Sequence, residues 1–121
     1  CLDVHVPDSH TNGGKVQIWD CANTPNQQWI LNGQQQLVNG VGKCLDVHVP
    51  DLYTNGGKVQ IWDCYPGLVN QQWRKEGIHM VNGAGKCLDV HLPDLSSNGG
   101  KVQIWDCVDG PNQNWMFGIT R

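Results

Sequence analysis

The sequence predicts an all-β protein made of three copies of one four-stranded unit, and three observations support this. The segment 1–21 recurs as 44–64 with changes at only two positions, and again, with a few changes, as 87–107. Each copy contains short stretches in which apolar and polar residues alternate, as in strands that bury one face. No stretch of the chain has convincing helical spacing of its apolar residues.

The first copy shows the order of the expected elements. Its strands are predicted at four places: residues 1–5, 16–21, 26–31 and 36–39. A polar loop with the turn signal Asn12-Gly13-Gly14 separates the first two strands. We expect a turn with positive φ there rather than a phosphate-binding loop, because the strand-to-helix setting of such loops is missing.

The number of copies selects the architecture. A β-propeller also repeats four strands at this period and often carries Trp-Asp pairs, which are present here as Trp19-Asp20, Trp62-Asp63 and Trp105-Asp106. Propellers close with about 4–8 blades, however, so three units do not suffice. We therefore predict a β-trefoil with pseudo-threefold symmetry. It forms one domain over residues 1–121, with repeats 1–35, 36–78 and 79–121.

Six cysteines form three evenly spaced pairs, one in each repeat. An even count at regular spacing in a small chain predicts a disulfide framework and a secreted protein. The expected bridges are Cys1–Cys21, Cys44–Cys64 and Cys87–Cys107. Closing loops of this length contributes on the order of 3 kcal/mol per bridge, which suits a chain whose apolar fraction is only 39%. Zinc is the weaker interpretation, since no Cys-x-x-Cys occurs.

Composition and charge exclude several classes of function. The net charge is −3 and no basic run occurs, which argues against nucleic-acid binding. No apolar run reaches the roughly 18 residues of a membrane span. The carboxylate pair that recurs in every repeat is Asp3 and Asp20 with their counterparts. A glycosidase needs two carboxyl groups facing each other across a cleft, whereas strand parity turns Asp20 away from Asp3, so a glycosidase is not expected. We expect no enzyme activity, no cofactor and no metal.

The three motifs Cys-Leu-Asp-Val, Val-Gln-Ile-Trp-Asp-Cys and Gln-x-Trp together carry a resemblance. The last occurs as Gln27-Gln28-Trp29, Gln71-Gln72-Trp73 and Gln113-Asn114-Trp115. The sequence resembles the ricin B-chain type (R-type) lectins, also called family 13 carbohydrate-binding modules, over nearly its whole length. The resemblance implies a β-trefoil that binds sugars without catalysis, with one shallow site in each repeat.

The resemblance also implies which residues contact the sugar. Five positions of each repeat match the family's sugar-contacting positions: Asp3, Gln17, Trp19, Asn26 and Gln27; Asp46, Gln60, Trp62, Asn70 and Gln71; and Asp89, Gln103, Trp105, Asn112 and Gln113. All of them retain the expected residue type, so three working sites are expected. The family often favours galactose, whose axial hydroxyl leaves one face of the ring apolar.

Strand parity supports the same site from the residues alone. If Leu2, Val4, Val16 and Ile18 face the core, then Asp3, Gln17 and Trp19 face the other way. If Cys1 and Cys21 lie opposite each other, Asp3 lies opposite Trp19 and His5 opposite Gln17. The disulfide would then hold a carboxylate beside an exposed indole, a suitable pair for sugar hydroxyls and the apolar face of a sugar ring.

Each of these assignments has a structural alternative. Trp19, Trp62 and Trp105 are assigned to ligand stacking rather than to the core, whereas Trp29, Trp73 and Trp115 are assigned to the core. The three aspartates of the first strands are assigned to the sugar, although they could accept loop amides instead. The Asn-Gln pairs could equally brace the loop. Additional contacts are expected from His5, His48, His91 and Tyr65, and Tyr65 leads us to expect the tightest binding in the second repeat.

Three functions fit these features. The first is a free-standing secreted lectin for galactose or N-acetylgalactosamine glycans. The second is a targeting module of a larger glycoside hydrolase or toxin that binds xylan or another polysaccharide. The third is a protein-binding trefoil, against which the sugar-site residues argue. We expect repeat one to lack its first strand, because nothing like the segments 37–43 and 80–86 precedes Cys1. We therefore expect a longer chain, a further domain or an oligomer.

Overall fold

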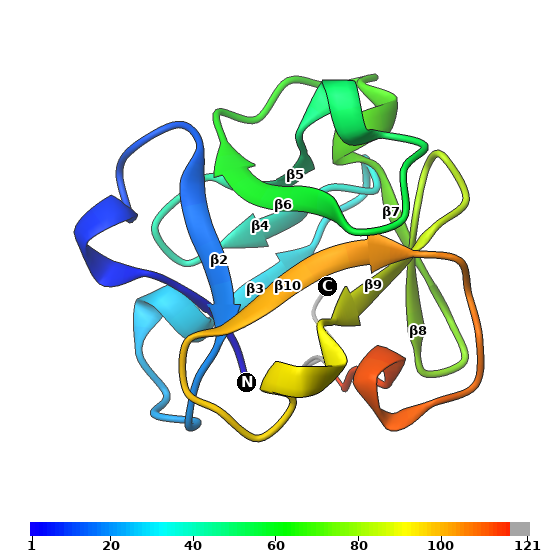
Figure 1. Cartoon of the computed structure of the whole chain (residues 1–121). Helices are drawn as coiled ribbons and strands as arrows, with labels where there is room; N and C mark the ends of the chain where they lie inside the picture. The colour runs from blue at the N-terminus through cyan, green and yellow to red at the C-terminus, as the bar shows by residue number, and fades with distance from the viewer. Residues whose placement is uncertain (117–121) are drawn as a thin grey trace.

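The computed structural model describes residues 1–116, and in this range the protein consists of short strands and 3₁₀ turns (Figure 1). The strands are β1 Leu2–Val4, β2 Gly14–Ile18, β3 Trp29–Leu31, β4 Leu37–Asn39, β5 Cys44–Val47, β6 Gly57–Trp62, β7 Trp73–Glu76, β8 His79–Asn82, β9 Cys87–Val90 and β10 Gly100–Trp105. The 3₁₀ turns are η1 Val6–Asp8, η2 Pro25–Gln27, η3 Val49–Asp51, η4 Val69–Gln71, η5 Leu92–Asp94 and η6 Pro111–Gln113.

The long strands β2, β6 and β10 form a closed triangle at the front of the view in Figure 1. Each pairs antiparallel with the other two: Lys15 lies opposite Gln60, Lys58 opposite Gln103, and Lys101 opposite Gln17. This cyclic pairing is the pseudo-threefold symmetry predicted from the three repeats, and the all-β trefoil architecture is confirmed.

Around this triangle, the repeats add further antiparallel pairings within the described residues. β1, β5 and β9 form hairpins with β2, β6 and β10. β4 and β8 pair on one side with β3 and β7, and on the other side with β5 and β9. The hairpins β3–β4 and β7–β8 therefore connect one repeat to the next.

The core contains equivalent apolar residues of the three repeats. Leu2 and Val4 are buried, as predicted, together with their counterparts in β5 and β9. Trp29, Trp73 and Trp115 are also buried, which confirms their assignment to the core. Each of their indole N–H groups donates to a backbone carbonyl of the first strand of its repeat, those of Leu2, Leu45 and Leu88, at 2.9–3.0 Å. The closing Trp of each repeat thereby holds the last segment on the first hairpin.

Some element boundaries differ from the prediction. The third strand of repeat one begins at Trp29 instead of at residue 26, because residues 25–27 form η2, which Pro25 starts. The polar loop after β1 similarly contains η1. A strand was also expected to follow Asn112, but Trp115 and Met116 have irregular backbone and the remainder of that segment, residues 117–121, lies outside the described residues.

All three disulfides are formed as predicted, but the expected register of the hairpins was wrong. Cys44 lies opposite Trp62 in the ladder and Asp46 opposite Gln60, and the same register holds in the other repeats. Asp46 is therefore not opposite Trp62, and Asp3 is not opposite Trp19. The chain leaves the ladder after the Trp, because the next residue donates its backbone N–H elsewhere, and the second Cys lies beyond the end of the strand.

That backbone N–H belongs to a contact between repeats, here called the clasp. In the first clasp, Asp63 N donates to Asn12 Oδ1 at 2.8 Å and Asn12 Nδ2 donates to Asp63 Oδ2 at 3.1 Å. Lys43 Nζ donates to Asn12 Oδ1 at 2.8 Å and to Asp63 Oδ1 at 2.6 Å, and its side chain is only 14% exposed. The second clasp contains Asn55, Lys86 and Asp106 in the same arrangement.

The glycines of the Asn-Gly-Gly turn fit the same junction. The first glycine of the turn in repeat one, Gly13, has a φ of 86°, which confirms the predicted turn. The second glycine of each turn is buried against the neighbouring repeat. In repeat two, a Cβ on Gly57 would lie 2.7 Å from the Asp51 carbonyl oxygen and 2.9 Å from Ile104 Cγ1. A side chain at this position would therefore push two repeats apart.

We predict that Gly57→Ala destabilises the protein by about 1–3 kcal/mol, the usual range for overpacking a buried site. Chemical denaturation would measure the loss. The matched control is Gly33→Ala, where a Cβ would meet no atom within 4 Å, and which should leave stability unchanged or slightly raise it. Equal effects of the two substitutions would contradict the close contact between repeats.

The clasp also predicts a pH dependence of stability. The hydrogen bonds from Lys43 and then from Asn12 hold the pKa of Asp63 below its ordinary value of 3.8. Because this pKa is lowered in the folded protein, the contact stabilises folding above pH 3.8, and the contribution is lost as the pH falls through the lowered pKa. Asp63→Asn should therefore lower the free energy of unfolding at neutral pH, with a difference that shrinks on acidification.

Urea denaturation at a series of pH values would measure this difference. Asp109→Asn is the control, since Asp109 is exposed and accepts no hydrogen bond within the described residues. Asp63→Asn and the unsubstituted protein could instead differ in free energy of unfolding by the same amount down to the lowest pH. That result would show that the ion pair does not contribute.

Candidate functional site

Each repeat contains the same buried carboxylate, surrounded by three side-chain amides. In the second repeat, Asp46 Oδ1 accepts from Gln60 Nε2 at 2.9 Å, while Oδ2 accepts from Asn70 Nδ2 at 3.1 Å and Gln71 Nε2 at 2.9 Å. The clusters of the other repeats agree with these distances to within 0.1 Å. We call this arrangement the carboxylate–amide cluster. It contains four of the five residues predicted for each site.

Three elements position the cluster. Asp46 on β5 lies opposite Gln60 on β6, so the two side chains share one face of the hairpin. Asn70 and Gln71 come from η4, and their amides also bind backbone: Asn70 donates to Val47 O at 3.1 Å, and Gln71 donates to the Asp63 carbonyl at 2.9 Å. The Asn-Gln pair therefore braces the loop onto the hairpin, which was one of the two predicted roles.

This bracing covers groups that were expected to face solvent. The three aspartates are 3–4% exposed and the three glutamines of the second strands 4–5%. The parity of the strand was predicted correctly, because these side chains do point away from the core residues of their strands. The 3₁₀ turn that carries Asn and Gln then closes over them, and Gln71 and Gln113 are completely enclosed.

The cluster leaves the carboxylate one position for a further donor. A carboxylate has about four lone-pair positions, and the three amides occupy three of them. The remaining one lies on Oδ1, which accepts a single hydrogen bond, from Gln60. No Lys or Arg forms an ion pair with these aspartates within residues 1–116. The free position is thus suited to a neutral donor such as a hydroxyl.

Burial is the main influence on the ionisation of this carboxylate. It raises the pKa of Asp46 above the ordinary value of 3.8, although hydrogen bonds from Gln60, Gln71 and Asn70 and the nearby charge of His48 act in the opposite direction. The effect of His48 agrees with its predicted place beside the site. His5, His48 and His91 directly follow the first strand of their repeats and precede the 3₁₀ turns η1, η3 and η5.

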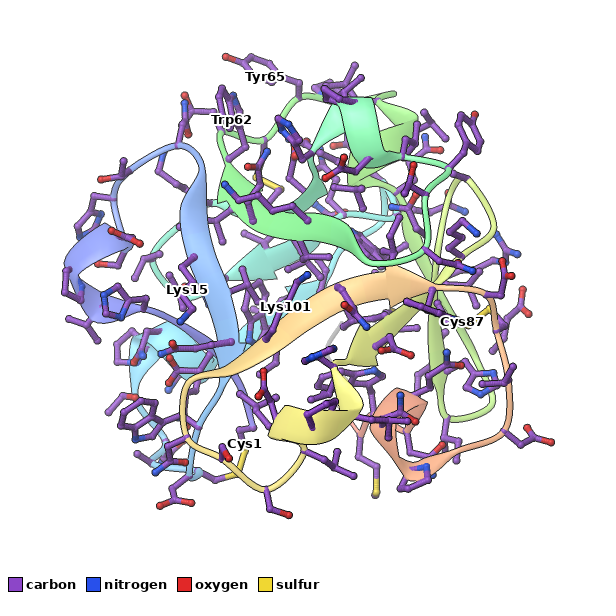
Figure 2. The ribbon with its side chains drawn as sticks, in the orientation of Figure 1. Cys1, Lys15, Trp62, Tyr65, Cys87 and Lys101 are labelled. Carbon is purple, nitrogen blue, oxygen red and sulfur yellow. A yellow bond between two sulfur atoms is a disulfide. The ribbon has the colours of Figure 1, made fainter. Side chains whose placement is uncertain are left out.

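The tryptophans of the second strands are the exposed part of the site. Trp19, Trp62 and Trp105 are 44%, 38% and 41% exposed, as predicted from strand parity. Each lies two residues beyond the Gln that pairs with the aspartate and on the same face, so Trp and Asp are diagonal cross-strand neighbours whose Cα atoms lie about 7–8 Å apart. In Figure 2, Trp62 and Tyr65 project together from the same edge of the molecule. Tyr65 is 51% exposed, so repeat two presents two aromatic rings.

A neighbouring repeat contributes to each site. A Cβ on Gly13 would lie 3.8 Å from Trp62 Cζ3 and 3.9 Å from Gln60 Oε1, and Gly56 and Gly99 lie in the same way against Trp105 and Trp19. The turn of one repeat, held by the clasp, therefore borders the indole of the next. Sequence reasoning missed the clasp residues. Their recurrence in each repeat was visible, but nothing in the sequence showed that the contact crosses between repeats.

Within residues 1–116, no group of three or more His, Cys, Asp or Glu side chains is placed to hold a metal ion. No helix in the same range is long and apolar enough to cross a bilayer.

The solved structures most similar to this chain include a designed protein, a lectin and an enzyme. The designed threefold-symmetric protein ThreeFoil is 32% identical in sequence. The match covers 94% of this chain and 86% of ThreeFoil, with a TM-score of 0.78. The C-terminal half of the earthworm R-type lectin, solved in complex with N-acetylgalactosamine, is 20% identical. The match covers 93% of this chain and 85% of the lectin chain, with a TM-score of 0.76. An exo-β-1,3-galactanase from Clostridium thermocellum is 28% identical, covering 94% of this chain and 26% of its own, with a TM-score of 0.74.

A search of curated proteins by sequence found no match. The family model of the ricin-type beta-trefoil lectin domain, by contrast, matches residues 1–73 and 54–120, which together span nearly the whole chain. The motifs, the threefold strand pairing and this match agree. The chain belongs to the ricin-type beta-trefoil lectin domain family, a family of carbohydrate-binding domains.

Proposed function

We propose that this protein is a non-catalytic, multivalent lectin for galactose or N-acetylgalactosamine glycans, with one shallow site in each repeat. One observation carries the proposal. All three repeats place an exposed indole on the same face as a buried carboxylate that retains one free acceptor position. A sugar needs both groups, since it presents an apolar C–H face and directed hydroxyl groups.

In the proposed complex, the pyranose ring stacks on the indole of Trp62 and one of its hydroxyls donates to Asp46 Oδ1. A hydrogen bond to an ionised acceptor is shorter and stronger than a neutral one, so this contact should dominate the polar interactions. The amides of Gln60, Asn70 and Gln71 hold the carboxylate in place. We assign direct contact to the indole and the carboxylate, and a positioning role to Asn70 and Gln71, whose amide hydrogens are already used.

Galactose suits this geometry because its axial hydroxyl leaves one face of the ring apolar, and that face can cover an indole. The earthworm lectin with N-acetylgalactosamine bound supports the choice of sugar class by its similar fold. Three disulfides in a chain of 121 residues support an extracellular setting.

Three sites per chain favour a role in which several glycans are bound at once. The three sites belong to separate repeats and each has an exposed indole, so they can engage separate sugars on a densely glycosylated surface. Bivalent engagement raises avidity by about 10²–10⁴-fold where the geometry permits it. Three shallow sites of modest individual affinity can therefore act together.

A second candidate is a targeting module of a larger carbohydrate-active enzyme. The similarity to the exo-β-1,3-galactanase, of which the match covers 26%, favours this alternative. The two candidates differ in ligand: a targeting module should prefer oligomers of galactan or xylan to monosaccharides, whereas a surface lectin should bind terminal galactosides. Competition by oligosaccharides against an immobilised galactoside would distinguish them.

Calorimetric titration with methyl β-galactoside tests the proposal. We expect three sites per chain in the unsubstituted protein and two in Trp62→Ala, since that substitution removes one stacking surface. Tyr65→Ala should weaken the second site alone, because Tyr65 enlarges its aromatic surface. Circular dichroism would confirm that both variants remain folded. An unchanged number of sites in Trp62→Ala, or no binding of any galactoside, xylose or mannose oligomer, would refute the proposal.

A further inference from the structure

The outer face of the triangle carries one lysine from each of its three strands. We call these residues, Lys15, Lys58 and Lys101, the lysine triad. All three are exposed, whereas the residue that follows each of them is buried: Val16, Val59 and Val102. Because side chains alternate along a strand, the lysines point away from the valines and into solvent. The triad is distinct from the residues assigned to the sugar sites.

Strand pairing brings the triad together around the pseudo-threefold axis. Lys101 lies opposite Gln17, and Lys15 precedes Gln17 by two residues on the same face of β2. Lys15 and Lys101 are therefore diagonal cross-strand neighbours, whose Cα atoms lie about 7–8 Å apart. The pairings of Lys58 with Gln103 and of Lys15 with Gln60 give the other two pairs of lysines the same relation. Each lysine is thus a neighbour of both others.

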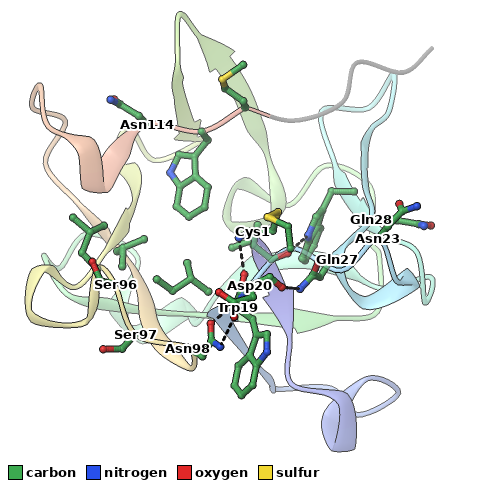
Figure 3. Close-up of a pocket in the computed structure, with 18 of the residues that line it drawn as sticks. Cys1, Trp19, Asp20, Asn23, Gln27, Gln28, Ser96, Ser97, Asn98 and Asn114 are labelled. Carbon is green, nitrogen blue, oxygen red and sulfur yellow. Dashed lines mark hydrogen bonds between the residues drawn. A yellow bond between two sulfur atoms is a disulfide. The ribbon is translucent and has the colours of Figure 1, made fainter.

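The side chain of Lys15 agrees with this convergence. In Figure 2, Lys15 and Lys101 both lie at the front of the triangle. Lys15 Nζ donates to Gly99 O at 3.5 Å, on the turn that leads into Lys101. Hydrogen bonds between Asn98 and Asp20, shown in Figure 3, hold that turn against repeat one. The ammonium group of Lys15 therefore lies beside the start of the strand that carries Lys101.

The carboxylates next to the triad are held by other groups. Each lysine of the triad donates its backbone N–H to a carboxylate at 3.0–3.1 Å, those of Asp8, Asp51 and Asp94. The aspartates of the carboxylate–amide clusters accept from amides instead. The ion pairs within residues 1–116 involve other cations: Lys43, Arg74 and Lys86. In this range, the three ammonium groups of the triad therefore form no ion pair.

This arrangement concentrates positive charge on a protein whose net charge is −3. Three ammonium groups at this spacing repel one another, and an anion on the axis would turn that repulsion into attraction. Each ammonium group has three N–H donors on a flexible stem, so all three can turn towards one point. A tetrahedral oxyanion suits threefold symmetry, because it can present one oxygen to each lysine. The charges come from three separate repeats, so no basic run marks them in the sequence.

We propose that the lysine triad binds one tetrahedral oxyanion, a sulfate or phosphate group, on the pseudo-threefold axis. Each ammonium group donates a charge-assisted hydrogen bond to a different oxygen of the anion. The fourth oxygen points away from the protein and can be part of an ester. The same site therefore accepts a free anion or the sulfate or phosphate group of a glycan.

Titration of the full chain with sodium sulfate, and separately with sodium phosphate, tests the proposal. Each anion replaces chloride at constant ionic strength, so that screening is unchanged and a response reports a bound anion. The NMR signals of the lysine Cε–H groups give the readout. We expect the signals of the whole triad to follow one saturable curve, with a dissociation constant on the order of 10 mM. The titration contains no sugar, so its result does not depend on the proposed lectin function.

Substitution distinguishes one shared site from three independent lysines. Lys15→Gln should weaken sulfate binding roughly threefold as reported by Lys58 and Lys101, because a shared anion loses one of its three contacts. Lys75→Gln is the matched control and should leave the binding unchanged. Lys75 is also exposed and forms no ion pair within residues 1–116, but it lies on β7, outside the triangle. The other signals of each spectrum show that the variant remains folded.

Galactose 6-sulfate and unmodified galactose, titrated in the same way, identify the source of the anion. A saturable shift of the triad signals with the sulfated sugar alone assigns the site to a glycan sulfate as well as to the free anion. A response to sodium sulfate alone assigns it to the free anion. The proposal is overturned if neither sulfate nor phosphate gives a saturable shift of these signals. It is equally overturned if Lys15→Gln leaves the curves of Lys58 and Lys101 unchanged, or if Lys75→Gln weakens them as much.

Discussion

The carboxylate–amide cluster is the interaction on which both the fold of a repeat and its site depend. Asp46 receives one amide from the strand opposite and two from η4, so a single side chain connects the hairpin to the loop that closes the repeat. That loop leads directly to Trp73, whose indole fills the core. Leaving a buried donor or acceptor unsatisfied costs about 1–3 kcal/mol, so removal of the carboxylate would disturb three amides at once.

The same cluster prepares the site for a ligand. Because the amides hold the carboxylate, its free acceptor position has a fixed direction relative to the indole on the same face. In the proposed complex, a sugar would bind to groups that are already ordered, which would reduce the entropy lost on binding. The structural role of Asp46 and its proposed role in recognition are therefore compatible, since the hydrogen bonds that stabilise the repeat also orient the acceptor.

The repeats depend on one another as well. The turn that borders Trp62 belongs to the preceding repeat, and the clasp of Asn12, Lys43 and Asp63 fixes it there. A repeat in isolation would lack this border and the strand pairing of the triangle. Using one unit three times thus stabilises the trefoil and completes each candidate site. This explains why Asn-Gly-Gly and the lysine before the second and third repeats recur together with the residues of the carboxylate–amide cluster.

The sequence predicted features that follow from local alternation and from the number of repeats. The inward side chains of Leu2 and Val4, the exposed indole of Trp19 and the three disulfides were all predicted correctly. The register of the hairpins was predicted wrongly, because it depends on the acceptor of the Asp20 backbone N–H. That acceptor is Asn98 Oδ1, which lies 78 residues away in the sequence. Burial of Asp3 was missed for a similar reason, since the covering amides come from a loop that follows a separate strand.

The most direct test of the central claim is the pKa of the Asp46 carboxyl, measured by carbon-detected NMR with and without a saturating galactoside. In the free protein, burial raises this pKa above 3.8. If a sugar hydroxyl donates to Oδ1, it favours the ionised form, so the account predicts that the bound sugar lowers the pKa. A pKa of Asp46 that stays the same or rises when the sugar binds would contradict the proposed role of this carboxylate as the acceptor.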